Sequence, residues 1–153
     1  QFGHNDEVPT KKTYTTEAEF RNNLTQYIKE TKAKNARPVL LTPVARRKFD
    51  STGKVVGTHD VYAAIVRSVA ATEKVPLIDL DKEAQHLYQQ LGEEASTLLF
   101  NHLARGEHPN YPSGKIDDTH FNELGARKIA EIVLRNIRAT LPELAKKINA
   151  PQK

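Results

Sequence analysis

The 153-residue sequence contains neither cysteine nor methionine. Without cysteine the chain has no disulfide, no thiol nucleophile and no zinc site built on thiolates, although its redox compartment stays open. No apolar run reaches the roughly 20 residues that a membrane-spanning helix needs, and the first residues lack the charged and apolar regions of a signal peptide. These absences favour a soluble protein. The missing methionine predicts that the chain is excised from a longer one.

Charge is also not concentrated anywhere in the chain. Hydrophobic residues make up 38% and charged residues 27% of the sequence, and both signs are interspersed, which is typical of a globular domain. The formal net charge of +4 would suit nucleic acid. However, the basic residues are scattered, and close pairs such as Arg46–Arg47 and Lys146–Lys147 are short. We therefore expect no specific nucleic-acid binding.

Apolar residues recur at helical spacing in several segments. Thr16 followed by Glu19 forms a candidate capping box before the first segment, and Thr58 is expected to cap the second. The last segment has the clearest amphipathic pattern and is expected to pack on a sheet through Leu124, Ala126, Ile129, Ala130, Val133, Ile137 and Leu141. The expected helices cover about 16–34, 58–74, 84–91 and 122–141, with a short turn at 96–100.

Two brief apolar runs, at 38–42 and 77–80, are bounded by proline and fit buried strands better than helices. Polar loops are expected at 44–57 and 106–114. Strands that alternate with helices favour an open parallel α/β sheet, in which ligands gather at the carboxyl ends of the strands. Two strands alone would leave long unpaired edges, so the fold is expected to be incomplete at its amino end.

Two short polar motifs are candidates for chemistry. Asp117 and His120 lie three residues apart, a spacing that lets the carboxylate turn back to the imidazole and fix its tautomer. Asn5, beside Gly3, has an amide that can stabilise an oxyanion. Taken separately, each motif also fits a purely structural role, since Asp and Asn favour ordinary turns and helix starts.

Together the motifs G-H-N-D (3–6) and D-x-x-H (117–120) resemble the SGNH (GDSL) hydrolases, specifically the rhamnogalacturonan acetylesterase group. The segments L-T-P-V-A-R-R (41–47) and N-Y-P (110–112) are also similar to bacterial members. The resemblance implies an α/β fold with an SGNH/flavodoxin-like three-layer parallel sheet. Residues 1–153 would be the carboxyl-terminal part of one such domain, with its amino-terminal strands missing from this chain.

The resemblance also implies roles for individual residues. Asp117 would be the orienting acid, His120 the general base and Asn5 an oxyanion donor. Gly3, His4 and Asp6 would shape the loop that carries Asn5, and Gly3 and His4 are also candidates to bind the substrate. The substrate would be an O-acetylated plant-wall polysaccharide, a pectic rhamnogalacturonan, handled outside the cytoplasm. No cofactor or metal is implied.

Arg46 and Arg47 have two open interpretations. Guanidinium groups pair bidentately with carboxylates, so both side chains are candidates to bind an acidic polysaccharide such as one containing galacturonate. The alternative is that they belong to a solvated loop.

The nucleophile that the resemblance requires is not in the chain. In the family, the G-D-S block and a glycine block lie upstream of G-H-N-D, and neither occurs here. Ser51 in D-S-T mimics G-D-S, but Phe49 stands in place of the glycine and the triplet follows the wrong strand. Three other serines, at positions 68, 96 and 113, are not in strand-to-helix elbows. We expect negligible turnover from these residues alone.

Other interpretations stay open at this point. The chain would alternatively be a non-catalytic carbohydrate-binding remnant or pseudoenzyme, or a basic interaction module. Self-association through the exposed sheet edge would supply missing strands. A metal site would combine His102, His108, Asp117 and His120, although their spacing matches no tight helical pair of ligands. The sequence assigns no role to residues 142–153.

Overall fold

The computed structural model describes residues 1–148, which form two compact units. The first unit comprises Gln1–Val44, His59–Asp81 and residues 133–148. The second comprises Ala45–Thr58 and Lys82–Ile132. Among residues 1–148, no helix is long and apolar enough to cross a membrane.

Helix α1 (Glu17–Ala33) begins at the predicted capping box. The Thr16 hydroxyl accepts a hydrogen bond from the Glu19 backbone N–H, and the Glu19 carboxylate accepts one from the Thr16 N–H at 2.8 Å. These two bonds satisfy N–H groups that have no partner within the helix. The prediction of a helix over 16–34 is confirmed, and its buried face carries Phe20, Leu24 and Ile28.

Helix α2 (Asp60–Glu73) corrects the prediction that Thr58 caps it. Its N-cap residue is His59, which makes no side-chain capping bond. The Thr58 hydroxyl instead accepts a hydrogen bond from the Arg46 backbone N–H at 2.9 Å, within the polar loop. The helix ends at Lys74, whose left-handed backbone (φ 52°) terminates the helical hydrogen bonding.

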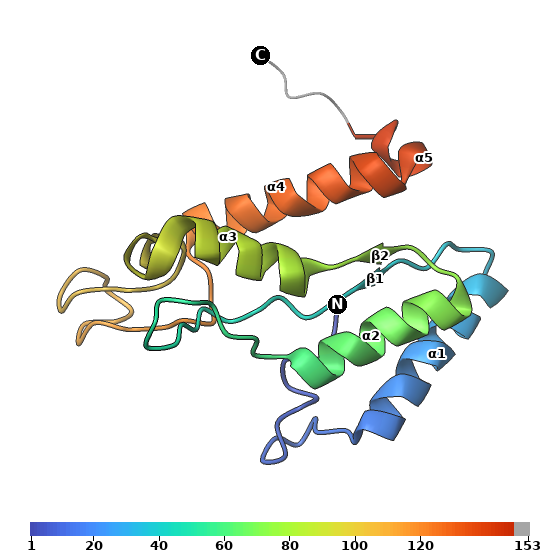
Figure 1. The fold of residues 1–153 in the computed structure, drawn as a ribbon, viewed down its shortest axis with the longest axis horizontal. Helices are drawn as coiled ribbons and strands as arrows, with labels where there is room; N and C mark the ends of the chain where they lie inside the picture. Colours follow the sequence, from blue (N-terminus) through green and yellow to red (C-terminus); the bar gives the residue numbers. More distant parts are fainter. Residues whose placement is uncertain (149–153) are drawn as a thin grey trace. The chain divides into compact units, whose positions relative to one another are not determined.

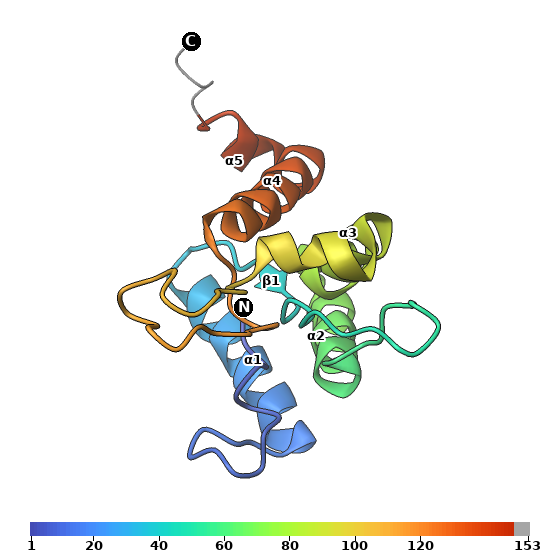
Figure 2. The ribbon, with the colours of Figure 1, turned by 90° about the vertical axis from the view of Figure 1, so that its left-hand side faces the viewer.

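Strands β1 (Leu40–Leu41) and β2 (Leu77–Ile78) pair in parallel, with Leu40 opposite Leu77. Both lie within the predicted strand segments, and the prediction of an α/β fold with parallel strands is confirmed. Figures 1 and 2 show α1 and α2 side by side. Their apolar faces form one core against which Leu40, Val75 and Leu77 pack, and this core consists of Phe20, Leu24, Ile28, Tyr62, Ile65, Val66 and Val69.

An ionic network ties together the carboxyl ends of the two strands. The Thr42 hydroxyl donates to Asp79 at 3.1 Å and accepts from the Asp81 backbone N–H at 2.8 Å. The Arg67 guanidinium binds Asp79 through two nitrogens and Asp81 through one, at 2.6 to 2.9 Å. Because Asp81 is almost fully buried, this cation is needed to offset the cost of burying its carboxylate. The network holds the two strand ends, from which the loop at 44–57 and helix α3 start.

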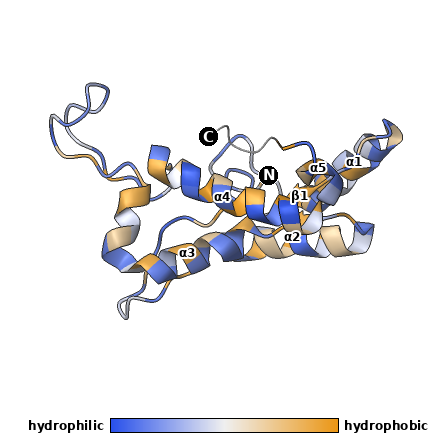
Figure 3. Ribbon diagram, turned by 90° about the horizontal axis from the view of Figure 1, so that it is seen from above, coloured by the Kyte–Doolittle hydropathy of each residue, from blue (hydrophilic) through white to orange (hydrophobic). Residues whose placement is uncertain are grey.

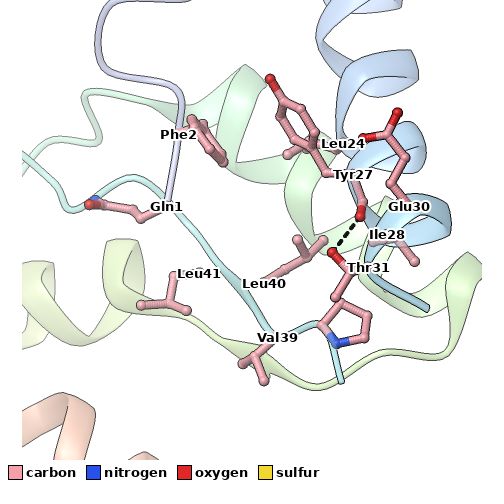
Figure 4. A pocket seen from close by; sticks show the side chains of 11 residues that line it. Gln1, Phe2, Leu24, Tyr27, Ile28, Glu30, Thr31, Val39, Leu40 and Leu41 are labelled. Carbon is pink, nitrogen blue, oxygen red and sulfur yellow. Dashed lines mark hydrogen bonds between the residues drawn. The ribbon is translucent and has the colours of Figure 1, made fainter. Parts of the chain in front are cut away.

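A largely apolar pocket lies along β1 and α1 (Figure 4). The first two residues of the chain line it, and the Phe2 ring contacts the Tyr27 ring with centroids 5.4 Å apart. Leu40 and Thr42 direct their N–H groups toward β2, so the N–H of Leu41 points to the opposite edge of β1. Within residues 1–148 no further strand pairs with that edge.

The second unit has its own aromatic core. The ring of Tyr88, from α3 (Leu80–Ala95), contacts Phe100, and Phe100 contacts Phe121, with centroids 5.6 and 4.9 Å apart. The Tyr88 hydroxyl donates to the Ala45 carbonyl at 2.9 Å, and burial raises the pKa of this phenol. Helix α3 is interrupted at Gly92, whose φ of 77° is not helical. The predicted short turn follows as a 3₁₀ helix, Ser96–Leu99.

Helix α4 (Glu123–Thr140) begins where the sequence predicts, but only part of its predicted face is covered. Leu141 is buried and Ile129, Val133 and Ile137 are half-buried, as predicted. Leu124, Ala126 and Ala130 are exposed, whereas Gly125 and Ile132 are buried. The reason is the close approach of Gly125 to the Leu99 carbonyl oxygen, which places position 125, and position 132 two turns later, on the inner side. Figure 3 shows hydrophobic and hydrophilic residues alternating along α4. Helix α5 (Pro142–Ala145) follows.

Candidate active site

The segment between the 3₁₀ helix and α4 is a long loop cross-linked by its own backbone. Leu103 and Lys115 exchange two backbone hydrogen bonds, at 2.7 and 2.9 Å, and Tyr111 donates to the His108 carbonyl. Gly114 has a φ of 81°, and a Cβ at this position would lie 2.7 Å from the Leu103 carbonyl oxygen. Only glycine fits this close approach, which sets the direction in which the chain enters Lys115 and the residues after it.

Asp117 and His120 lie in contact at the end of this loop. The Asp117 Oδ2 atom lies 2.8 Å from Nδ1 of His120. Its Oδ1 atom accepts hydrogen bonds from the backbone N–H groups of Thr119 and His120, at 2.8 and 2.9 Å. The D-x-x-H spacing therefore folds the carboxylate back onto the imidazole within one turn. The structure brings these two residues together, and their catalytic roles stay predictions.

The two side chains of this pair differ in exposure, because the carboxylate is largely buried and the imidazole is open to solvent. The Asp117 side chain is 10% exposed and the His120 side chain 74% exposed. With Nδ1 directed at the carboxylate, the imidazole holds its proton on Nδ1 and its lone pair on Nε2. His120 can thus accept a proton from a group that approaches from solvent, while Asp117 fixes the ring from behind.

Asp117 remains a carboxylate well into the acid range. Burial alone would raise its pKa, but the Lys115 ammonium at 2.9 Å, the N–H groups of His120 and Thr119, and the His120 ring together hold the pKa far below the ordinary value of 3.8. Hydrogen bonding to Asp117 in turn raises the pKa of Lys115. The carboxylate is therefore available to stabilise an imidazolium on His120.

This depressed pKa predicts a pH dependence of folding stability. A carboxyl group whose pKa is lower in the folded state than in the unfolded state stabilises the protein above its unfolded pKa, and that contribution is lost as the pH falls. We expect the free energy of unfolding to decrease below about pH 4, and to decrease less in Asp117→Asn. Urea unfolding of both proteins from about pH 7 down to about pH 3 checks this. If the difference in unfolding free energy between the wild type and Asp117→Asn were the same at about pH 7 and at about pH 3, the prediction would be contradicted.

Arg47 is engaged within the protein, which does not fit the prediction that it binds a substrate carboxylate. Its Nη1 atom donates to Asp118 at 2.9 Å, its Nε atom donates to Ser96 at 2.9 Å, and its Nη2 atom donates to the Glu93 carbonyl. The side chain is only 11% exposed. Arg47 therefore fastens the predicted loop at 44–57 to the residue that follows Asp117. For the half-buried Arg46, substrate binding stays a prediction.

His102 belongs to the same cluster as Arg47. Its Nε2 atom lies 2.8 Å from Oδ1 of Asp118, the oxygen that also accepts from Arg47. His120 pairs with Asp117 instead, and His108 packs its ring against Tyr111. No three such side chains in the part of the chain that the structure describes are grouped to hold a metal ion.

The G-H-N-D segment lies in the first unit and forms a tight turn. Gly3 has a φ of 127°, and a Cβ there would approach Pro43 to 3.0 Å. The Gly3 N–H donates to Asp6 at 3.0 Å, so Asp6 shapes the turn, while Asn5 is exposed at its tip. Asn5 and the Asp117–His120 pair belong to different units, and the oxyanion role of Asn5 stays a prediction.

A buried histidine that belongs to no sequence motif supports this turn. His59 lies with its Nδ1 atom 2.5 Å from the Glu7 carboxylate. Its ring meets that of His4 edge-on, with centroids 4.3 Å apart. His4 therefore packs against the start of α2. Only the fold reveals this contact, because His59 is 55 positions away from His4 and follows no motif.

The serines within residues 1–148 have local structural partners or are exposed. Ser51 is exposed in a turn in which Oδ1 of Asp50 accepts from the Thr52 N–H, the Thr52 hydroxyl and the Lys54 N–H, so D-S-T is an ordinary Asx turn. Ser96 accepts from Arg47 and donates to the Glu93 carbonyl. The hydroxyl of Ser68 accepts from Arg21.

Comparison with known proteins identifies the family. The model of the GDSL-like lipase/acylhydrolase family matches residues 1–128. This chain belongs to that family. The match includes both the G-H-N-D turn and the Asp117–His120 pair.

Two relatives and one solved structure, all from Bacillus subtilis, are similar to this chain. The chain is 41% identical to the rhamnogalacturonan acetylesterase RhgT of Bacillus subtilis over 138 residues, 90% of this chain and 58% of RhgT. It is 32% identical to the probable rhamnogalacturonan acetylesterase YesY of the same organism, over 90% of this chain and 60% of YesY. The crystal structure of B. subtilis protein YxiM matches with a TM-score of 0.74 and 28% identity, over 91% of this chain and 35% of that one. This GDSL-family chain thus spans about three-fifths of RhgT and YesY.

Proposed function

We propose that this chain carries the acid–base half of a carbohydrate acetylesterase that removes O-acetyl groups from rhamnogalacturonan. The observation that carries the proposal is the Asp117–His120 pair, bonded at 2.8 Å with the imidazole open to solvent, in a GDSL-family chain. The 41% identity to RhgT, a rhamnogalacturonan acetylesterase by name, supports the substrate class. Activity outside the cytoplasm on pectin is part of the same proposal.

The proposed reaction is a two-step acyl transfer. Nε2 of His120 takes the proton of a serine hydroxyl, and the serine oxygen attacks the acetyl carbonyl carbon. Collapse of the tetrahedral intermediate breaks the bond to the sugar oxygen, which receives the proton from His120. A water molecule, deprotonated by the same nitrogen, then attacks the acetyl-serine. The bond to the serine oxygen breaks, this oxygen receives the proton from His120, and acetate is released. Asp117 stabilises the imidazolium in both steps, and the Asn5 amide donates to the oxyanion.

The serine of this mechanism must come from a G-D-S segment, which residues 1–153 do not contain. The sharpest test is therefore a chimera in which the amino-terminal segment of a family member that carries G-D-S precedes Gln1. Acetate release from acetylated rhamnogalacturonan is measured for the chimera and for the 153-residue chain. We expect turnover in the chimera and negligible turnover in the chain alone.

The controls separate the proposal from its rivals. His120→Ala in the chimera should abolish turnover, while His108→Ala, a histidine whose ring packs on Tyr111 in the same loop, should retain it. Turnover that survives His120→Ala would reject this residue as the base. Activity of the 153-residue chain alone would indicate that a serine within it, such as Ser51, is the nucleophile. A folded chimera that binds the polysaccharide but releases no acetate would favour a non-catalytic carbohydrate-binding protein.

A further inference from the structure

Lys115 contacts the Asp117–His120 pair directly. Its ammonium nitrogen lies 2.9 Å from Oδ2 of Asp117, the same oxygen that lies 2.8 Å from the imidazole of His120. One carboxylate oxygen therefore serves two groups, a permanent cation and the candidate base. The sequence offers no hint of this arrangement, because the lysine lies outside the D-x-x-H motif.

Three features hold the lysine in this position. Its backbone is paired with Leu103 through two hydrogen bonds. Its ammonium group also lies over the Tyr111 ring, 4.6 Å from the centroid, a favourable cation–π contact. Its side chain is 29% exposed, less than half the exposure of the His120 side chain. The ammonium group therefore lies between the Tyr111 ring and the Asp117 carboxylate and contacts both.

We propose that Lys115 is a positioning residue of the Asp117–His120 pair, whose ammonium group anchors the Asp117 carboxylate and shares the negative charge that this carboxylate presents to the His120 ring. A cation near an imidazole disfavours the imidazolium form, and it also takes part of the negative charge that Asp117 would otherwise offer to the ring. The effect of the Lys115 charge on His120 does not depend on the proposed esterase function. Its consequence for catalysis rests on that function.

The other charged groups around the pair are fixed by separate contacts. Asp118 follows Asp117 in the chain, but its carboxylate is bound by Arg47 and His102. The carbonyl oxygen of His120 accepts from the neutral amide of Asn101 at 3.2 Å. None of these contacts involves the Lys115 side chain, so a change in the His120 titration on substitution of Lys115 reports on the lysine.

The test is an NMR titration of the His120 ring in the 153-residue chain, which needs neither a serine nor a substrate. In Lys115→Met we expect the titration midpoint of His120 to move to higher pH by about 0.5 unit at low ionic strength. Lys115→Arg keeps the cation and should leave the midpoint near that of the wild type. Lys128→Met is the matched control, because Lys128 also pairs with a carboxylate, that of Glu131, on the exposed side of α4.

The outcomes are distinct. An unchanged or lower midpoint in Lys115→Met, or an equal rise in Lys128→Met, overturns the proposal. The backbone amide signal of His120 reports whether the turn is intact, and if Lys115→Met melts the turn, Lys115→Gln carries the same expectation. In an active chimera, the acid limb of kcat/KM should move up by the same amount in Lys115→Met. Failure of the esterase assay with the expected NMR shift would reject the proposed function and retain the role of Lys115.

Discussion

Replacing Asp117 with asparagine is expected to lower kcat of the chimera roughly 10⁴-fold, the scale seen when an orienting carboxylate becomes an amide. Two backbone N–H groups point at the Oδ1 position and hold the amide oxygen there. The NH₂ group then occupies the Oδ2 position, where the ion pair with Lys115 is lost, and it donates to Nδ1 of His120. The imidazole proton moves to Nε2, where the base needs a lone pair.

Two measurements check this expectation independently. Steady-state acetate release gives kcat, and nitrogen NMR of the 153-residue chain gives the His120 tautomer without any substrate. Asp50→Asn is the matched control, since Asp50 accepts three hydrogen bonds in an exposed turn and has no histidine partner. It should change neither quantity. An Asp117→Asn variant that keeps its proton on Nδ1, or a chimera that keeps its kcat, would contradict the orienting role.

Gly125→Ala is expected to destabilise the second unit by about 3 kcal/mol or more. A glycine-to-alanine change inside a helix ordinarily stabilises a protein by roughly 0.5–1 kcal/mol, so the sign itself is diagnostic. Here an added Cβ would lie 2.0 Å from the Leu99 carbonyl oxygen and 2.8 Å from the Phe121 ring. Because the carbonyl belongs to the backbone, relief requires α4 to move away from the aromatic core.

Urea unfolding followed by near-UV circular dichroism measures this loss. Gly53→Ala is the control, because Gly53 has a φ of 76° but an added Cβ there would meet nothing within 4 Å. It should cost only about 1–2 kcal/mol, the penalty for a left-handed backbone. A Gly125→Ala protein as stable as the wild type would show that α4 does not require this close contact.

Local elements with a strong periodic signal were predictable from sequence. The capping box of Thr16 and Glu19 and the proline-bounded strands both follow from interactions between residues close in the chain. The Asp117–His120 contact was equally accessible, since a spacing of three residues allows one turn to close it. In these cases short-range geometry leaves few alternatives.

Predictions that depended on the exact limits of a buried face or on a distant partner were less successful. The exposure of Leu124, Ala126 and Ala130 on α4 follows from the Gly125 contact with Leu99, 26 positions earlier, and a helix with apolar residues on a broad arc does not specify these limits. Thr58 fits the composition of a helix cap, yet its hydroxyl is taken by the Arg46 N–H. Arg47 fits an exposed loop by composition, yet Asp118, 71 positions later, binds it inside the unit.

The sequence by itself determined the family, the α/β class and the identity of the Asp–His pair, because motifs and hydrophobic periods are local properties of the chain. Only the tertiary structure decided which cations surround that pair. Lys115 reaches Asp117 because the backbone bridge to Leu103 and the Tyr111 ring hold it there. Arg47 reaches Asp118 because folding closes a long loop. Electrostatic contacts depend on distance in space, which the order of residues does not encode directly.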